Sequence, residues 1–351
     1  MPSIIFAAFC KWGSIFTRLM KLNKNIKIFI NFILGPILFI WLSWSIYNQV
    51  NHQPNLEASW LKIKESFKSP LIINLFVVIF LMLVNWSLEA LKWRISVQQV
   101  QQVSFLKSLM AIFSGVSFAV TTPNRTGEYL GRVLYMNEGN RLKVISLTIL
   151  GSISQLIATF LFGVAGIFIL KSRIIESGSS EWPIWINLVL TSGVIALFFL
   201  TVFYFKLNWL AKWIDKLPGI KKYAWLISEL EKVNATLLLQ LLSLSLVRYI
   251  IFGVQYYLLF QFFAIDVNAW QGFWAMAIVF FIMAVIPTIA LFEIVQKVYV
   301  AKEIFAIFTV NTLGIGLVTT TIWCINLVIP AIIGSLLIIS IKIFKKQNEN
   351  S

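Results

Sequence analysis

The sequence is poor in the residues that metal sites and catalytic centres most often use. It contains two cysteines, one histidine and two aspartates. Cys10 lies in the basic N-terminal segment and Cys324 in an apolar run, so we expect neither a disulfide framework nor a cysteine-based metal site. Asp215 and Asp266 lie far apart in the chain, which excludes an Asp-x-Asp metal site of the glycosyltransferase kind.

The sequence also lacks the short motifs of common enzymes. It has no glycine-rich phosphate loop and no grouping of a nucleophile with a histidine. Its polar segments are all shorter than about thirty residues, which leaves no room for a soluble catalytic domain within these 351 residues. We therefore expect no enzymatic activity, no catalytic residues, no metal ion and no cofactor.

Charged residues are scarce as well, at 12%, whereas hydrophobic residues make up 59% of the chain. A soluble domain is typically about 45–50% apolar. The hydrophobic residues form long runs, several of them close to the roughly 20 residues with which a helix crosses a bilayer. Barrel strands would instead be about 10 residues long and alternate in polarity. The sequence predicts an all-α integral membrane protein, a polytopic helical bundle with about six to eight crossings.

The net charge of +15 fits a membrane surface better than a nucleic acid. The lysines cluster beside apolar runs, as the positive-inside rule and anionic lipid headgroups favour. We expect no nucleic-acid partner. The charge pattern divides the chain into a cytoplasmic interfacial segment at 1–27, a transmembrane domain at 28–341 and a cytoplasmic tail at 342–351.

The long apolar runs predict the membrane-spanning helices and their direction. The lysine-rich loop at 206–232 is predicted to be cytoplasmic, and counting crossings from it places both termini on the same side. Residues 304–341 permit either one long kinked span or two short ones. The other predicted spans are 28–47, 71–91, 144–170, 184–205 and 235–263.

The apolar segment 105–120 differs from these spans because its 16 residues are too few for a comfortable crossing. A motif that concentrates charge follows it directly, with Arg125, Glu128 and Arg132 as its charged residues. A re-entrant hairpin that dips in from the cytoplasm fits both the length of the segment and these charges. Such a turn is tolerated only where protein or a water-filled cavity surrounds it, so we predict a polar cavity at the motif.

A second short segment, 270–286, has a similar continuation. It ends at Pro287, and Glu293 and Lys297 follow. Paired interrupted segments in corresponding halves of a chain indicate an inverted-repeat transporter. The match between the two segments is loose and leaves open whether they form a true inverted repeat. We predict two re-entrant or interrupted segments that meet in the polar cavity.

The first motif has two interpretations. On a helix that begins at Pro123, the side chains of Arg125, Glu128 and Arg132 share one face. They either form a self-neutralised charge cluster that marks the membrane surface, or Glu128 holds the arginines in place so that they bind a phosphate group. Gly127 would let another helix or a headgroup approach closely.

Arg248 lies about 13 residues into its predicted span, near the middle of the membrane, where an unpaired arginine is expensive. Its expected partners are Glu128, Glu293 or a lipid phosphate. Glu293 is either part of the same site or an acid that Lys297 neutralises one helical turn later.

Two groups of residues complete the prediction. Three charges near the end of the span 71–91 are expected to end their helix at the headgroups, namely Glu89, Lys92 and Arg94. The candidate substrate-binding residues are Pro123, Arg125, Gly127, Glu128, Arg132, Arg248, Pro287 and Glu293.

The motif from Pro123 to Arg132 resembles the signature of the lysylphosphatidylglycerol synthase transmembrane region, also called the flippase-like family. Residues 86–94 are similar to the family's early span, which ends in an Arg-Trp or Trp-Arg pair, and residues 287–293 to its later Pro, Gly-rich, Glu element. The resemblance covers roughly residues 28–341. The chain departs from it at 288–292, where Thr-Ile-Ala-Leu-Phe replaces the usual glycines.

The resemblance implies a multi-pass protein of the prokaryotic cytoplasmic (inner) membrane. Such a protein would flip or carry an anionic lipid or a lipid-linked intermediate, and would contact its headgroup or phosphate. The chain looks like the stand-alone form, without the soluble synthase domain of the bifunctional members. Two alternatives stay open, namely a membrane-embedded transferase that uses Glu128 as a base on a lipid-linked substrate, and a non-transporting partner of a separate enzyme. The sequence does not indicate any protein partner.

Overall fold

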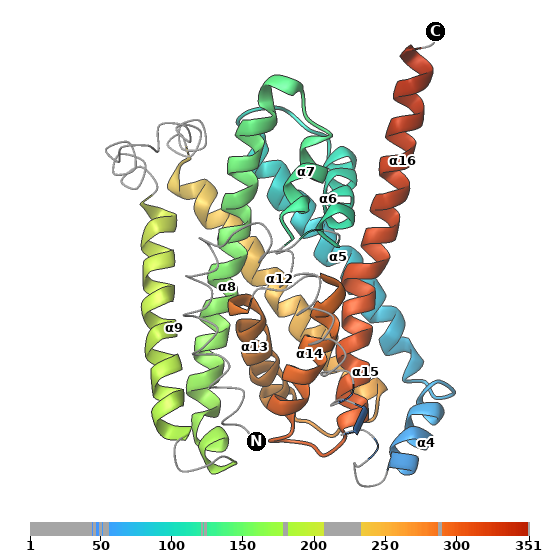
Figure 1. The fold of residues 1–351 in the computed structure, drawn as a ribbon, viewed down its shortest axis with the longest axis vertical. Helices are drawn as coiled ribbons and strands as arrows, with labels where there is room; N and C mark the ends of the chain where they lie inside the picture. The colour runs from blue at the N-terminus through green and yellow to red at the C-terminus, as the bar shows by residue number, and fades with distance from the viewer. Residues whose placement is uncertain are drawn as a thin grey trace, which may run out of the picture.

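The computed structural model describes residues 44, 47–48, 51, 56–120, 122, 125–177, 182–206, 233–286 and 290–349. Within these ranges every regular element is helical, as the sequence predicts (Figure 1). The first helices are α4 (Leu56–Ser66), α5 (Ile72–Val97), α6 (Phe105–Val120), α7 (Gly127–Val133), η2 (Glu138–Asn140), α8 (Arg141–Glu176) and α9 (Trp182–Phe205). The later ones are α12 (Ala235–Phe262), α13 (Ala269–Val285), α14 (Ala290–Phe305), α15 (Thr312–Trp323), η5 (Cys324–Val328) and α16 (Ile329–Glu349).

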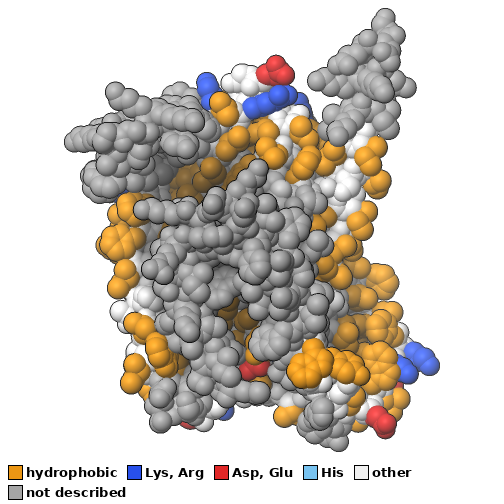
Figure 2. Space-filling view, in the orientation of Figure 1, with side chains coloured by type: hydrophobic (Ala, Val, Ile, Leu, Met, Phe, Trp, Pro, Cys, Tyr) orange, Lys and Arg blue, Asp and Glu red, His pale blue; other side chains and the backbone are white. Residues whose placement is uncertain are grey.

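Five of the described helical stretches are long and apolar enough to cross a membrane. Four of them correspond to the predicted spans at 71–91, 144–170, 184–205 and 235–263, and the fifth is Thr312–Ser340. Hydrophobic side chains cover the flanks of the face in Figure 2, and the Lys and Arg side chains drawn there lie in its upper and lower parts. The predicted span at 28–47, apart from residues 44 and 47, and the interfacial segment at 1–27 lie outside the described residues.

Helices α6 and α7 form a tight antiparallel hairpin. A methyl group placed on Gly131 would lie 2.5 Å from Gly115 Cα, so the two backbones touch at glycine. The open ends of the hairpin meet as well, because Gln101 Oε1 accepts hydrogen bonds from Asn137 N–H at 3.1 Å and from Asn140 Nδ2 at 3.3 Å. The chain therefore leaves the hairpin at the end of the bundle where it came in, which is the geometry of the predicted re-entrant segment.

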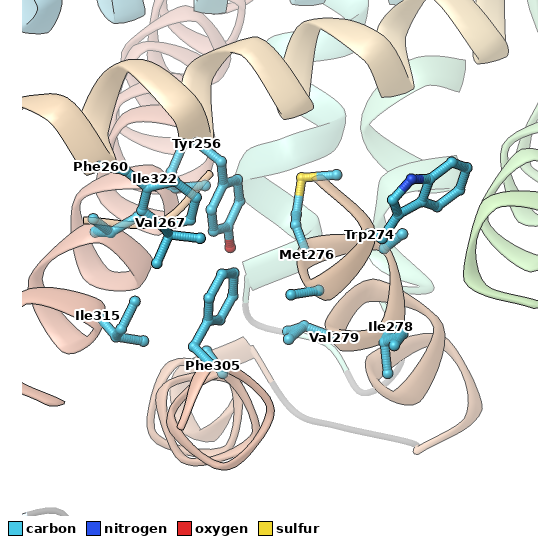
Figure 3. Close-up of a cluster of buried hydrophobic side chains, with 14 of the residues drawn as sticks. Tyr256, Phe260, Val267, Trp274, Met276, Ile278, Val279, Phe305, Ile315 and Ile322 are labelled. Atoms are coloured by element: carbon cyan, nitrogen blue, oxygen red, sulfur yellow. The ribbon is translucent and has the colours of Figure 1, made fainter. Parts of the chain in front are cut away.

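Helices α13 and α14 form the second hairpin. Phe305, the last residue of α14, packs against Phe260 of α12 with ring centroids 5.2 Å apart. Gly272, near the start of α13, comes so close to the same ring that an added methyl group would lie 2.8 Å from it. Side chains from α12, α13, α14 and α15 converge in the buried cluster of Figure 3. This hairpin also begins and ends at one end of the bundle.

The two hairpins come from opposite ends of the bundle. α5 and α12 pack antiparallel, since Gln255 Nε2 donates to Val78 O at 2.9 Å towards one end and Lys92 Nζ donates to Ser245 Oγ at 3.2 Å towards the other. The hairpin α6–α7 follows the C-terminal end of α5, and the hairpin α13–α14 follows that of α12. They consequently lie in the upper and lower halves of Figure 1.

This arrangement relates the two halves of the chain as an inverted repeat. α13 packs against α8, the long helix of the first half, and α6 packs against α16 of the second half. A glycine permits each contact, because an added methyl group would lie 2.9 Å from Trp274 O at Gly166 and 1.9 Å from Phe113 O at Gly334. The order of long helix, hairpin and long helix occurs twice in opposite directions, which explains the loose likeness of the two short segments.

The apolar stretch 304–341 is broken once, near its start. α14 ends at Phe305, and Asn311 caps the next helix by accepting a hydrogen bond from Gly314 N–H at 2.9 Å. α15, a π-helical turn of five residues and α16 then continue as the span Thr312–Ser340. One span therefore follows the second hairpin.

We predict that the two hairpins open on opposite sides of the membrane. After replacement of the two native cysteines, Gln102→Cys and Glu138→Cys, which flank the first hairpin at exposed positions, should be labelled by a membrane-impermeant maleimide from one side only. Asp266→Cys and Val310→Cys flank the second hairpin at exposed positions and should be labelled only from the other side. Labelling of the two flanks of one hairpin from different sides would show that this hairpin crosses the membrane.

Candidate functional site

Glu89 is the centre of a buried network of charges. It lies on α5, and only 6% of its surface is exposed. Its carboxylate forms ion pairs with Lys92 Nζ at 2.8 Å, with Arg132 Nη2 at 2.9 Å and with Arg248 Nη1. The three cations come from α5, α7 and α12. One carboxylate therefore ties the first hairpin to a long helix of each half.

Arg248 is fixed by neutral groups in addition to Glu89. Its Nε donates to Asn85 Oδ1 at 2.7 Å, and its Nη1 donates to Gln155 Oε1 at 3.2 Å. The guanidinium carbon lies 5.8 Å from the centre of the Trp86 ring, which is a cation–π distance. An arginine in the middle of a membrane span is tolerated only with such partners.

Lys92 lies one helical turn after Glu89 and is 2% exposed. Its Nζ donates to Gly151 O and to Ser245 Oγ, each at 3.2 Å. The Ser245 hydroxyl in turn shares a hydrogen bond of 2.8 Å with Ser154 Oγ. With the Glu89 contact, all three donors of the ammonium group are used, and α5 is joined to α8 and α12.

The first hairpin reaches this network through Arg132 and Glu128. α7 begins at Gly127, whose N–H donates to Thr122 Oγ1 at 2.7 Å, and an added methyl group there would lie 2.4 Å from the backbone of α6. Only glycine fits this turn. Glu128 and Arg132 form an ion pair along α7, as their spacing of four predicts. Arg132 is thereby held between two carboxylates, those of Glu89 and Glu128.

A second contact joins the two hairpins to each other. Arg125 Nη2, in the turn before α7, lies 2.7 and 2.8 Å from the two carboxylate oxygens of Glu293 on α14. The Arg125 side chain is 45% exposed and that of Glu293 is 11% exposed. Lys297 follows Glu293 by one turn and places its ammonium group 4.8 Å from the centre of the Phe280 ring. The two interrupted segments meet here, as predicted.

The structure corrects the predicted geometry of the first motif. Arg125 is not on the helix, because α7 begins at Gly127 and Arg125 has a left-handed backbone conformation with φ 57°. It therefore does not share a helix face with Glu128 and Arg132, and its partner is Glu293. At the place where we predicted a polar cavity, described carboxylates contact the guanidinium groups of Arg125 and Arg132, and the cavity itself stays a prediction. Two predicted site residues lie outside the described residues, Pro123 and Pro287.

Two of the three predicted partners of Arg248 are wrong, and the third, a lipid phosphate, stays a prediction. The acid that contacts it is Glu89, and neither Glu128 nor Glu293 is its ion-pair partner. Glu293 is not simply neutralised by Lys297, because Arg125 from the other hairpin contacts both of its oxygens.

Sequence reasoning missed the role of Glu89 and Lys92, which we expected at the headgroups. Both are buried, because α5 continues to Val97, eight residues beyond Glu89. At 1.5 Å per residue, this places Glu89 about 12 Å before the end of the helix. The apolar residues Ile95 and Val97, which follow Glu89 and Lys92, were the signal in the sequence that the helix continues beyond these charges. Arg94 is the residue that lies near the helix end, where its Nε donates to Val103 O at 3.0 Å.

The network is better suited to binding an anion than to holding a metal ion. Its guanidinium groups present planar donors of the kind that carboxylates and phosphates accept. In the described part of the chain, no group of three or more His, Cys, Asp or Glu residues is placed to hold a metal ion.

Comparison with known families matches residues 28–334 to a family model described as the lysylphosphatidylglycerol synthase TM region. The matched range contains every residue of the network described above, and it confirms the resemblance seen in the motif. No curated protein and no solved structure matches the chain significantly.

We predict that Glu89→Gln strongly destabilises the protein. The variant keeps the shape of the side chain but leaves three buried cations without their shared anion, and breaking a buried ion pair typically costs about 3–5 kcal/mol. The measurement is the free energy of unfolding in detergent micelles. Glu138→Gln is the matched control, because Glu138 is 87% exposed and, among the described residues, its ion-pair partner is Arg141 at 3.5 Å. Equal stability of the two variants would contradict the buried network.

Proposed function

Because this chain belongs to the family of the lysylphosphatidylglycerol synthase transmembrane region, we propose that it moves an anionic lipid or lipid-linked intermediate across the cytoplasmic membrane of a prokaryote. The family indicates a function that involves membrane lipids. The observation that carries the narrower proposal is the ion pair of Arg125 and Glu293, which joins two hairpins from opposite ends of a multi-pass bundle.

A charged headgroup cannot cross the hydrocarbon core without compensation for its lost hydration. The guanidinium groups of Arg125, Arg132 and Arg248 supply donors that match phosphate oxygens in geometry and charge. Arg125 is the most accessible of these donors, since its side chain is 45% exposed and that of Arg132 only 3%. A headgroup meets Arg125 first and the buried arginines afterwards.

In this network, carboxylates take the place that a phosphate would occupy. Glu293 uses both oxygens on Arg125, so an arriving phosphate competes with Glu293 for the same guanidinium group. Displaced from Arg125, Glu293 becomes free to take up a proton or a cation. Glu128 keeps Arg132 oriented during this exchange.

When a phosphate replaces Glu293 at Arg125, the two hairpins also lose the ion pair that joins them. The ion pair of Arg125 with Glu293 links the hairpin α6–α7 to the hairpin α13–α14. Its release allows one half of the bundle to move against the other. Movement of one repeat against the other around a central site is the usual route to alternating access in transporters with inverted repeats.

We predict that Glu128→Gln and Arg132→Ala slow lipid translocation about tenfold or more, because each removes a charge-assisted hydrogen bond worth about 1.5–3 kcal/mol. The assay uses purified protein in liposomes with a fluorescent phosphatidylglycerol in one leaflet, and it measures the transfer of the label to the other leaflet. Arg125→Gln is a third variant, chosen because the Arg125 side chain is half-exposed and its replacement disturbs the packed interior less than that of the buried Arg132.

Arg141→Ala is the matched control, since Arg141 lies beside the same hairpin but its ion-pair partner within the described part of the chain is the exposed Glu138. It should translocate lipid at the wild-type rate. Equal rates in the wild type, the three variants and empty liposomes would contradict transport. A new lipid product in mass spectra of the same vesicles would favour the transferase alternative, and activity only with a co-purified protein would favour the partner alternative.

A further inference from the structure

The charge network contains more positive than negative groups. Among the described residues its bases are Lys92, Arg125, Arg132, Arg248 and Lys297, and its acids are Glu89, Glu128 and Glu293. When all eight groups are ionised, five positive and three negative charges leave an excess of two positive charges. The helix dipoles do not remove this excess, because each hairpin tip brings together one helix C-terminus and one helix N-terminus, whose partial charges oppose each other.

Three nitrogen atoms around the network give an independent indication. Asn85 Nδ2, Trp86 Nε1 and Arg132 Nε are buried and have no hydrogen-bond partner among the residues that the structure describes. Asn85 and Trp86 both contact Arg248, so these atoms belong to the surroundings of the same charges. All three are donors, and a buried donor without a partner costs about 1–3 kcal/mol. A ligand rich in acceptors suits these positions, whereas an ammonium group, which can only donate, does not.

From these two observations we infer that the ligand of the network is a phosphate group with two negative charges, the phosphomonoester or diphosphate headgroup of a lipid. This inference rests on the proposed function and narrows its substrate class. A phosphomonoester carries about 1.5–2 negative charges near neutral pH and three acceptor oxygens. It therefore neutralises the excess charge and offers acceptors to the unpaired donors at the same time.

Other headgroups balance the network less well. The phosphodiester of phosphatidylglycerol has one negative charge and leaves one positive charge of the network uncompensated. A lysylated phosphatidylglycerol has a net positive charge and adds to the excess instead of reducing it. Uncompensated charge within the hydrocarbon core is strongly disfavoured, so the order of binding is phosphomonoester, then phosphodiester, then the lysylated lipid.

The test is a competition experiment with the whole chain in phosphatidylcholine nanodiscs at pH 7, where a phosphomonoester has lost most of its second proton. Radiolabelled phosphatidic acid is the probe, and phosphatidylglycerol, lysylphosphatidylglycerol and soluble pyrophosphate are the competitors. We expect phosphatidic acid to bind about tenfold more tightly than phosphatidylglycerol, which corresponds to about 1.4 kcal/mol. Lysylphosphatidylglycerol should compete least among the lipids.

Two variants that change the charge of the network in opposite directions distinguish an effect on ligand recognition from an effect on folding. Lys297→Gln lowers the excess charge to one and should reduce the preference for phosphatidic acid over phosphatidylglycerol several-fold. Glu293→Gln raises the excess to three and should keep or increase this preference. A folding defect would change both variants in the same direction. Arg141→Gln, outside the network, should leave the preference unchanged.

The outcomes distinguish this inference from the proposed function. If phosphatidylglycerol bound as tightly as phosphatidic acid or more tightly, and were also translocated, the inference of a doubly charged ligand would be wrong. The proposal of lipid transport would be unaffected. Binding of no anionic lipid above phosphatidylcholine, with no translocation, would overturn both. If pyrophosphate displaced phosphatidic acid at equal concentration, the site would bind a free phosphate, and the inference that the phosphate belongs to a lipid would be wrong.

Discussion

The carboxylate of Glu89 is the group on which the polar interior of this bundle depends. Three cations from three helices share it, and each of them is almost completely buried. In an interior built from apolar side chains, no other described acid is in a position to neutralise Lys92 and Arg248. The relative positions of α5, α7 and α12 are therefore set by electrostatics as well as by packing, because moving any one of them would leave a cation unpaired.

Glycine makes this electrostatic arrangement sterically feasible. The contact of Gly115 with Gly131 lets α7 lie directly on α6, which brings Arg132 within reach of Glu89. Gly166 and Gly334 do the same for the contacts that hold each hairpin against the other half of the chain. Lipid tails are as apolar as the helix surfaces, so close backbone contact and internal ion pairs must hold the bundle together. We propose that the excess of cations in the network, which these contacts hold together, suits it to an anionic headgroup.

Much of the fold was predictable because the composition and the length of an apolar run indicate whether it crosses the membrane. The long helices, the short segment 105–120 and the second hairpin all follow from apolar runs of sufficient or insufficient length. The pairing of Glu128 with Arg132 was also predictable, because it depends only on their spacing along one helix. The ion-pair partners of Arg248 and Glu293 were not, since Glu89 and Arg125 are more than 150 residues away from them in sequence and nothing local indicates which helices lie side by side.

Hydrophobic length and charge placement are local properties, so the amino-acid sequence alone is enough to identify a helical membrane protein with two interrupted segments and a charged motif. It is also enough to identify the family, because the residues of the motif are contiguous. The three-dimensional packing was needed to see that Glu89 is buried at the centre of the network, that Arg125 lies outside helix α7 and contacts the opposite hairpin, and that the two halves run in opposite directions. A buried charge is stabilised by its partners, and these partners come together only when the antiparallel packing of α5 and α12 is formed.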